Sequence, residues 1–432
     1  MEMIAKLTNG NMLLQNKKIA IVGGGPGGLT LARLLQLKGV DVKVYERDIN
    51  ALVRIQGGAL DLHTESGLAA LDKAGLLHEF KKHYRHGAEL VRVVDNQAKI
   101  FADQHANAPV YEFGHKDHRP EIDRGPLRDI MLNSLKPDTL VWDSHIISIE
   151  KLQETWKLIF QNGQTIIADM VIGADGANSK IRPFVTDIKP FWTGIMVIEG
   201  SIKDAKKTAP KIHQLLKGGK IFAYGNEKTL IVSSKGDGSL GFGVSFKTKE
   251  FWDKESGIDF KDNKQVLAWF KQEYAAWSSV WYELFEHEGT LFIPRPQYCM
   301  PLNQKWQAQS NITLIGDAAH WMPPFAGEGV NMAMLDALRL SEALTSSEFV
   351  NTQTAIASYE KQMFKRFAVA GQGTMFNTEW MHQPNALSDM LSMFSLNIFK
   401  QGLFMVRMMV NVFVIPFIRK AVGLAPKQKA LK

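Results

Sequence analysis

The stretch KKIAIVGGGPGGLTLARLLQLKGVDVKVYE, residues 17–46, decides the fold of the chain. Residues 17–22 form a short apolar run that ends in glycines, and residues 26–39 have helical apolar spacing with a glycine at the end. Residues 40–46 alternate between apolar and polar side chains, as a strand does. The stretch therefore predicts one strand–helix–strand unit, the building block of a parallel α/β sheet.

Three glycines lie where the first strand gives way to the helix. Gly23, Gly25 and Gly28 form the pattern G-x-G-x-x-G, and Glu46 ends the second strand 18 residues beyond Gly28. Glycines permit a tight turn and a close approach to a pyrophosphate, whose charge the helix N-terminus stabilises, while Glu46 can accept hydrogen bonds from a ribose. We expect a bound dinucleotide here; the alternative is a purely structural turn.

The rest of the chain alternates between helical and strand patterns. We expect a helix over 60–83, a strand over 89–101 and a helix over 124–135, followed by successive strands. Strands dominate from about 183 to 298, and everything after residue 331 has a helical pattern. A two-residue period in this middle region predicts one aromatic-rich sheet face, formed by Leu240, Phe242, Val244 and Phe246.

Composition and charge exclude some classes of function. The chain has 432 residues, enough for two or three domains. Its net charge of +7 arises in the tail, because seven basic residues and no acidic residue follow Asp389. The body is therefore neutral and has no basic stripe, which argues against nucleic-acid binding. Cys299 is the single cysteine, so we expect no disulfide and a cytoplasmic location; the first 18 residues lack a long apolar stretch, so we expect no secretory signal.

Two further motifs follow apolar runs, VIGADGANSKIR at 171–182 and LIGDAAHWMPPFAGEGVN at 314–331. Asp175 and Asp317 come where strands end, the position from which open α/β sheets bind ligands, although an Asp-Gly pair can also simply form a turn. His320 has no histidine at metal-binding spacing, so we interpret it as a structural histidine and expect no metal site. We expect Glu328 to be solvated or to fix its loop rather than to act as a general base.

Together these motifs resemble the class A FAD-dependent monooxygenases of the aromatic hydroxylase type. Within that family the sequence is most similar to the tetracycline-inactivating monooxygenases, through VYERD, GGALDLH, PEIDRGPLRDIMLNSL, KIRPFVTD, GVSFKT and GDAAHWMPPFAGEGVN. The likeness covers roughly residues 12 to 370. It implies an α/β fold with a Rossmann-like FAD-binding domain interleaved with a β-sheet substrate domain, followed by C-terminal helices.

The resemblance also implies roles for individual residues. Glu46 binds the ribose, Arg47 lies near the flavin, Arg54 contacts NADPH, and Asp61 and Arg124 contact FAD. Asp175 belongs to the cofactor site, and Asp317 is expected near the ribityl chain. The residues expected around the isoalloxazine ring are Pro324, Gly327, Gly329 and Asn331.

The family's chemistry is carried by the flavin, so the resemblance implies no catalytic residue in the protein itself. NADPH binds transiently and reduces FAD, and the reduced flavin reacts with oxygen to give a C4a-hydroperoxide, which hydroxylates a phenol or an enolate. The protein positions the flavin and keeps water away. Two alternatives are a flavoprotein reductase or oxidase that inserts no oxygen, and a non-catalytic ligand-binding protein.

The substrate assignment depends on the middle domain, where this sequence departs from the tetracycline-inactivating enzymes. We expect substrate contacts from Glu199, Lys220, Gly241 and Met381. Lys220 stands where that family has an arginine, and lysine lacks the planar fork of donors. Gly241 stands where the family has a histidine, and Glu199 replaces a glutamine. Tetracycline and another polycyclic or phenolic compound therefore both remain candidate substrates.

The expected domains are discontinuous, and we expect a monomer. Residues 1–75, 112–182 and 298–345 form the FAD-binding domain, residues 76–111 and 183–297 the substrate domain, and residues 346–432 a C-terminal helical segment with a basic tail. The tail at 396–432 has two interpretations. We favour a helix that caps the substrate cavity over an amphipathic helix that makes peripheral contact with an anionic membrane.

Overall fold

A computed structural model describes residues 12–51, 53, 58–107, 111–115 and 118–394. At its centre lies a five-stranded sheet in the order β17-β11-β1-β2-β7, in which every neighbouring pair is parallel. The expected strand–helix–strand unit is present as β1, α2 and β2. The bounds are β1 Ile19–Val22, α2 Pro26–Leu37, β2 Val42–Tyr45, β7 Leu140–Val141, β11 Met170–Gly173 and β17 Ile312–Leu314.

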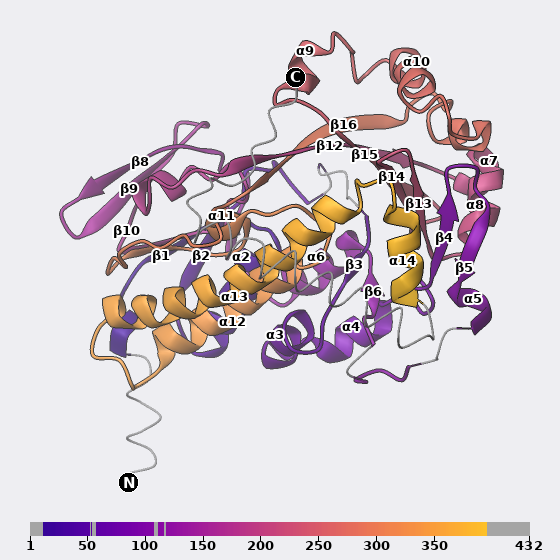
Figure 1. Cartoon of the computed structure of the whole chain (residues 1–432). Helices are drawn as coiled ribbons and strands as arrows, with labels where there is room; N and C mark the ends of the chain where they lie inside the picture. The colour runs from indigo at the N-terminus through magenta and orange to yellow at the C-terminus, as the bar shows by residue number, and fades with distance from the viewer. Residues whose placement is uncertain (1–11, 52, 54–57, 108–110, 116–117, 395–432) are drawn as a thin grey trace, which may run out of the picture.

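Helices α2, α12 (Gly329–Thr345) and α13 (Thr352–Trp380) cover this sheet, and α12 and α13 run side by side (Figure 1). A buried cluster that includes Ile21, Leu31 and Leu340 fills the space between them. Helices α2 and α12 approach closely because Gly27 has no side chain; a Cβ there would lie 3.1 Å from the carbonyl oxygen of Ala333. This contact places the start of α12 beside the glycine turn.

A second sheet of seven strands has the order β16-β12-β15-β14-β13-β4-β5. Its strands come from two separate parts of the chain. β4 and β5 precede the other five strands in sequence, and β4 joins them by pairing in parallel with β13. The bounds are β4 Val91–Asp95, β5 Ile100–Asp103, β12 Phe191–Ile202, β13 Lys220–Gly225, β14 Lys228–Ser234, β15 Leu240–Lys247 and β16 Leu291–Cys299.

The two faces of this second sheet pack against different helices. The predicted face of Leu240, Phe242, Val244 and Phe246 is confirmed: all four are buried, in one cluster with α8 (Pro210–Leu216), α10 (Asn263–Glu273) and η3 (Ser279–Leu284). On the opposite face, Val93 and Tyr224 pack against Trp380 at the end of α13 and Met390 in α14 (Ala386–Phe394). Figure 1 shows α14 beside β13.

Smaller elements connect the two sheets. The strands expected before residue 175 include β8 (Ile146–Leu152), β9 (Thr155–Phe160) and β10 (Thr165–Ala168), which form a three-stranded antiparallel sheet. Strands β3 (Leu60–Asp61) and β6 (Glu121–Ile122) pair with each other, and α6 spans Arg124–Asn133. The remaining short elements are η1 Met12–Leu14, α5 Gln104–Asn107, η2 Arg182–Phe184, α7 Ala205–Thr208, α9 Trp252–Glu255 and α11 Asp317–His320.

Two sequence-based predictions were wrong in detail. Residues 60–83 are not one helix, because β3 pairs with β6 and Gly75, at φ +73°, separates α3 (Gly67–Lys73) from α4 (Leu77–His83). Residues 89–101 are not one strand, because the carboxylate of Asp95 accepts hydrogen bonds from the backbone of Gln97 and Lys99 and reverses the chain between β4 and β5.

No helix within the described ranges is long and apolar enough to cross a membrane. The tail at 396–432, for which we weighed a cap over the cavity and a contact with lipid, lies outside the described residues.

Candidate functional site

The glycine turn after β1 has almost no room for side chains. Gly23 has a φ of +109°, and a Cβ there would lie 2.3 Å from the carbonyl oxygen of Ala174. A Cβ at Gly28 would lie 2.1 Å from the carbonyl oxygen of Gly23. Gly25 is different, because a Cβ at that position meets nothing within 4 Å. The N-terminus of α2 is therefore open at Gly25, as binding a phosphate there requires.

Glu46 at the end of β2 is tied to this turn. Its side chain is 2% exposed, and its carboxylate accepts hydrogen bonds from the backbone of Gly24, at 2.7 Å, and of Asp48, at 3.1 Å. The carboxylate thus lies beside the turn, where the ribose role predicts it. Arg47, the next residue, is exposed, and Arg54 lies outside the described residues.

Asp175 forms the turn that follows β11. Its carboxylate accepts hydrogen bonds from the Ser179 hydroxyl at 2.6 Å and from the backbone of Lys180 at 2.7 Å. Burial raises the pKa of Asp175, and these hydrogen bonds act in the opposite direction. Both carboxylate oxygens bind groups of the loop after β11. These are the contacts expected of an aspartate that forms a turn.

Sequence reasoning missed Arg182, which links the two aspartate motifs. Its guanidinium donates to the carbonyl oxygens of Ala177 at 2.9 Å, Asp317 at 2.8 Å and Ala318 at 2.6 Å. Burial lowers its pKa. The only signal was the arginine that ends GADGANSKIR, and its partners Asp317 and Ala318, 135 and 136 residues away, cannot be derived from spacing.

Asp317 begins α11, directly after Gly316, whose φ is +60°. The side chain is partly buried, and burial raises its pKa. Among the described residues, no group donates a hydrogen bond to its carboxylate. Because the side chain is not fully buried, a ligand that carries hydroxyl groups can donate to this carboxylate. The ribityl chain of FAD is such a ligand.

His320 belongs to a buried ion-pair network. Its Nε2 lies 2.6 Å from Asp336 Oδ2, and Arg366 donates to the other oxygen of Asp336 at 3.0 Å. Burial opposes a charge on His320, but the carboxylate of Asp336 outweighs burial and raises the histidine pKa. The described residues contain no group of three or more His, Cys, Asp or Glu that could hold a metal ion. These contacts agree with the interpretation of His320 as a structural histidine.

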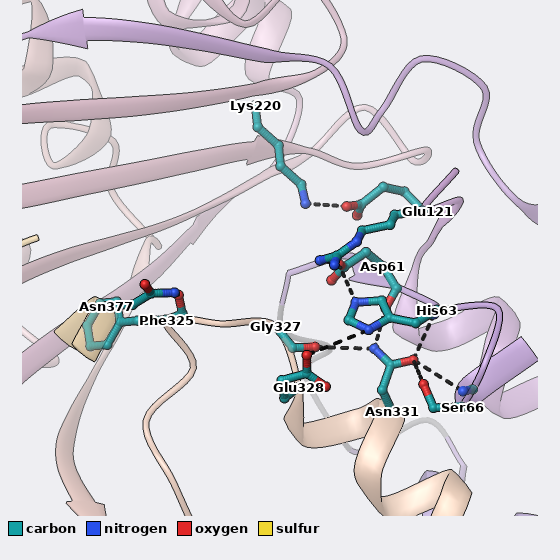
Figure 2. Close-up of polar contacts among 12 residues, drawn as sticks. Asp61, His63, Ser66, Glu121, Lys220, Phe325, Gly327, Glu328, Asn331 and Asn377 are labelled. Carbon is teal, nitrogen blue, oxygen red and sulfur yellow. Dashed lines mark hydrogen bonds and ion pairs between the residues drawn. The ribbon is translucent and has the colours of Figure 1, made fainter. Parts of the chain in front are cut away.

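Asn331 in α12 connects the β3–α3 segment to the loop before α12 (Figure 2). Its side-chain oxygen accepts from the backbone of His63 at 2.9 Å, and its amide nitrogen donates to the carbonyl oxygens of Asp61 at 2.9 Å and Gly327 at 3.2 Å. All of these partners are protein groups. The amide therefore positions the loop, and a direct contact with the isoalloxazine ring stays a prediction.

The loop before α12 faces Asp61. Gly327 has a φ of +70°, and a Cβ there would lie 3.1 Å from Asp61 Oδ1, so a side chain has little room. Glu328 is partly buried, burial raises its pKa, and its carboxylate lies 3.8 Å from His63. Pro324 is exposed, while Gly329 begins α12. These residues lie at the start of α12, and their contact with the isoalloxazine ring stays a prediction.

Arg124, at the start of α6, donates to the carbonyl oxygen of Gly58 at 3.0 Å. Gly58 in turn lies near the second sheet, since a Cβ added to it would be 3.5 Å from the Ser233 hydroxyl. This is where the segment that joins β2 to β3 approaches β14.

The four expected substrate residues all belong to or contact the second sheet. Lys220 forms an ion pair with Glu121 of β6, which is 1% exposed and whose pKa burial raises (Figure 2). Glu199 is about half exposed and pairs with Arg295 at 3.0 Å. Met381 is buried after the end of α13. In the strand register Glu199 pairs with Gly243, two residues from Gly241, so its side chain lies on the same sheet face as Lys220.

Gly241 leaves room that a lysine from the turn between β14 and β15 uses. A Cβ at Gly241 would lie 3.3 Å from Cε of Lys235, a residue that sequence reasoning missed. The Lys235 ammonium donates to the hydroxyl of Ser201 at 3.1 Å, and burial lowers its pKa. Ser201, Gly241, Ser233 and Lys220 are consecutive cross-strand partners and thus share one face.

His382 fixes Met381 against this face. Its Nδ1 donates to the carbonyl oxygen of Thr378 at 2.7 Å, and its Nε2 lies 2.8 Å from the hydroxyl of Ser245 in β15. Burial lowers the His382 pKa to about 4, so the neutral ring accepts from Ser245. Phe325, in the loop before α12, meets the His382 ring edge-on at 5.3 Å. The end of α13 thus contacts both the second sheet and the loop before α12.

The parallel sheet, the glycine turn and the carboxylate at the end of β2 define a dinucleotide-binding fold. A family model described as an FAD binding domain matches residues 16–121 and 302–370, which include the turn and Asp317. Monooxygenase asqM from Emericella nidulans is 27% identical over 392 residues, which cover 79% of this chain and 86% of the relative.

Solved structures share the fold. Tetracycline destructase Tet(51) superposes with a TM-score of 0.66 at 20% identity, covering 92% of this chain and 98% of the other. Klebsiella pneumoniae HpxO, complexed with FAD and uric acid, superposes with a TM-score of 0.69 at 18% identity, covering 88% and 93%. These solved structures show the fold. The match to the FAD binding domain model and the likeness to a monooxygenase make this chain similar to FAD-dependent monooxygenases.

The His320–Asp336 pair generates a pH dependence of stability. Because the fold raises the His320 pKa, its stabilising contribution is complete below the ordinary imidazole value of about 6.5 and is lost as the pH rises through the raised value. We expect the difference in melting temperature between the wild type and His320→Gln to be widest at pH 6 and to narrow towards pH 9. The control is His78→Gln, at an exposed position. A difference in melting temperature between the wild type and His320→Gln that grows as the pH rises would contradict a charged pair between His320 and Asp336.

Proposed function

We propose that this enzyme uses NADPH and O2 to hydroxylate a polycyclic or phenolic substrate, with tetracyclines as candidates. The observation that carries the proposal is the meeting of Lys220, from the second sheet, with Glu121 and the neighbouring Asp61 beside the loop before α12. This contact brings the second sheet to the predicted flavin site. We assign cofactor binding to the parallel sheet with its helices and substrate binding to the second sheet, within the domain boundaries expected from the sequence.

The residues present fit FAD. The open helix end at Gly25 suits the pyrophosphate, Glu46 suits the ribose, and the partly accessible carboxylate of Asp317 suits a hydroxyl of the ribityl chain. Bound FAD, reduced by NADPH, supplies the oxygen chemistry. The protein's part is to orient cofactor and substrate and to exclude water. The overall reaction consumes one NADPH, one proton and one O2, places one oxygen atom in the product and releases NADP⁺ and water.

Two lysines at the second sheet support the proposal that the substrate carries an anionic or acidic oxygen. Lys220 belongs to the row of cross-strand partners that contains Gly241, and Lys235 lies over Gly241. Burial strengthens electrostatic attraction at this place. We propose that Lys235 occupies the space where the tetracycline-inactivating enzymes have a histidine and supplies the cation for a phenolate or an enolate. Neighbouring apolar side chains from Ile231 and Met381 would contact the rings.

Mass spectrometry tests the reaction. The purified enzyme is incubated with NADPH, O2 and a panel of tetracyclines and simple phenols, and we expect a mass gain of one oxygen atom that becomes labelled when ¹⁸O2 is supplied. Consumption of NADPH with peroxide formation and no labelled product from any member of the panel would favour an oxidase. Reduction of the panel compound would favour a reductase, and binding without turnover a ligand-binding protein.

Asp317→Ala tests the cofactor site. Removal of one hydrogen bond between a charged group and FAD costs about 1.5–3 kcal/mol, so we expect retention of FAD to weaken by about tenfold or more. The measurement is flavin absorbance per chain after gel filtration, followed by titration with FAD. Asp317→Asn, which keeps an acceptor, should lose less; full occupancy in the alanine variant would refute the role.

Lys235→Met tests the substrate site. For an accepted substrate with an acidic hydroxyl, we expect KM to rise by about tenfold, because a charged hydrogen bond is lost, while FAD content stays unchanged. Lys207→Met on α7, an exposed position, is the matched control. An unchanged KM in the Lys235 variant would remove this lysine from the substrate site and leave the hydroxylation proposal standing.

A further inference from the structure

Lys220 and Glu121 join the second sheet to the strand pair β3–β6 (Figure 2). The ammonium of Lys220 donates to Oε1 of Glu121, and within the described part of the chain Oε2 accepts no hydrogen bond. The side chain of Lys220 is 20% exposed, whereas that of Glu121 is 1% exposed. A ligand on this face of the sheet can therefore reach the ammonium but not the carboxylate that it holds.

The surroundings of Glu121 disfavour its charge. Asp61 is its cross-strand partner, so two carboxyl groups lie next to each other. Burial raises the pKa of Glu121, and the charge of Asp61 acts in the same direction. Lys220 and Arg85 oppose this rise, but Arg85 is itself paired with Asp123 at 3.3 Å. A buried charge that loses its partner is strongly destabilised, so the carboxylate of Glu121 depends mainly on Lys220 to stay ionised.

Asp61, in contrast, keeps its charge. Burial opposes that charge, but the hydrogen bond with His63 at 3.1 Å and the positive charges of Lys220 and Arg119 lower the pKa of Asp61. Neighbouring carboxyl groups whose environments move their pKa values apart take different parts in acid–base chemistry. Glu121 is therefore the member of this pair that accepts a proton when another anion approaches Lys220.

We propose that Glu121 receives the proton of the substrate hydroxyl through Lys220. The ammonium passes one proton to Oε1 of Glu121 and takes the hydroxyl proton of the substrate in return. The O–H bond of the substrate breaks, an O–H bond forms on Glu121, and the N–H bond of Lys220 is restored. Protons and charge are conserved within the site. Lys220 contacts the substrate, and Glu121 acts through Lys220.

This inference rests on the proposed hydroxylation and adds a proton acceptor to it. A phenol of ordinary pKa, about 10, reaches the site protonated at neutral pH. Without its proton the ring is richer in electrons and reacts more readily with an electrophilic oxygen. The phenolate or enolate remains beside the ammonium of Lys220, and Lys235 over Gly241 adds a second positive charge on this face. The proton is meanwhile held on a side chain that water does not reach.

Binding of 4-nitrophenol to the FAD-loaded full chain, without NADPH, tests the proton transfer apart from turnover. The nitro group makes this phenol acidic enough to be ionised in solution at pH 8. Its phenolate therefore brings no proton, and we expect the wild type to take up about one proton per bound ligand from water. The dissociation constant, followed by the absorbance change of the phenolate, should then rise about tenfold between pH 8 and pH 9.

Glu121→Gln keeps the size of the side chain but cannot take up the proton. We expect this variant to bind 4-nitrophenol with nearly the same dissociation constant at both pH values. Isothermal titration in phosphate and in Tris should give about one proton taken up by the wild type and none by the variant. The matched control is Glu150→Gln, at an exposed carboxylate that pairs with Lys157, and it should behave as the wild type does. FAD content and melting temperature check that each variant is folded.

Three results would each overturn the proton transfer. They are the absence of saturable binding to the wild type, a wild-type dissociation constant that is the same at pH 8 and pH 9, and an equal rise in the wild type and Glu121→Gln. The last result would assign the proton to another group, such as Lys235. Because the labelling with ¹⁸O2 tests hydroxylation by itself, the proton transfer can be refuted while hydroxylation stands.

Discussion

The hydrogen bonds from Arg182 to three carbonyl oxygens hold the cofactor side of the molecule together. β11 and β17 are parallel neighbours, so the loops at their carboxyl ends meet at one sheet edge, but adjacency alone does not fix their conformations. The guanidinium replaces water at carbonyl groups of Ala177, Asp317 and Ala318, and it does so with a fork of donors that lysine lacks. The two aspartate motifs are thereby fixed relative to each other.

A second constraint acts between the sheets. Asn331 commits its amide to the β3–α3 segment and to the loop before α12, and Asn377 in α13 donates to the carbonyl oxygen of Phe325 in the same loop at 3.0 Å (Figure 2). His382 then ties the end of α13 to β15. The loop before α12 is therefore held by Asn331 of α12 and Asn377 of α13, and His382 links the end of α13 to the seven-stranded sheet.

The sequence predicted the features that depend on residues close to one another in the chain. The glycine turn, Glu46 and the alternating face from Leu240 to Phe246 follow from steric limits and from periods of two and 3.6 residues, and the structure contains them. The single helix over 60–83 failed because the pairing of β3 with β6 outweighed helical periodicity. Lys235 could not be predicted, because its position over Gly241 depends on the register between β14 and β15. Asp175 and Asn331 were selected as cofactor residues, yet the partners of their side chains are protein groups that only the fold reveals.

The parallel pairing of β4 with β13 has a consequence for how the chain matures on the ribosome. Strand β4 ends at Asp95, but its partner begins at Lys220, so at about 5–20 residues per second the earlier strand waits on the order of ten seconds for the later one. During that interval β4 and β5 present unpaired backbone groups next to a nascent chain whose first strand–helix–strand unit is already complete. The seven-stranded sheet is thus the part of the fold most open to wrong pairing during synthesis, and it is completed only after β13 and the strands that follow it have been translated.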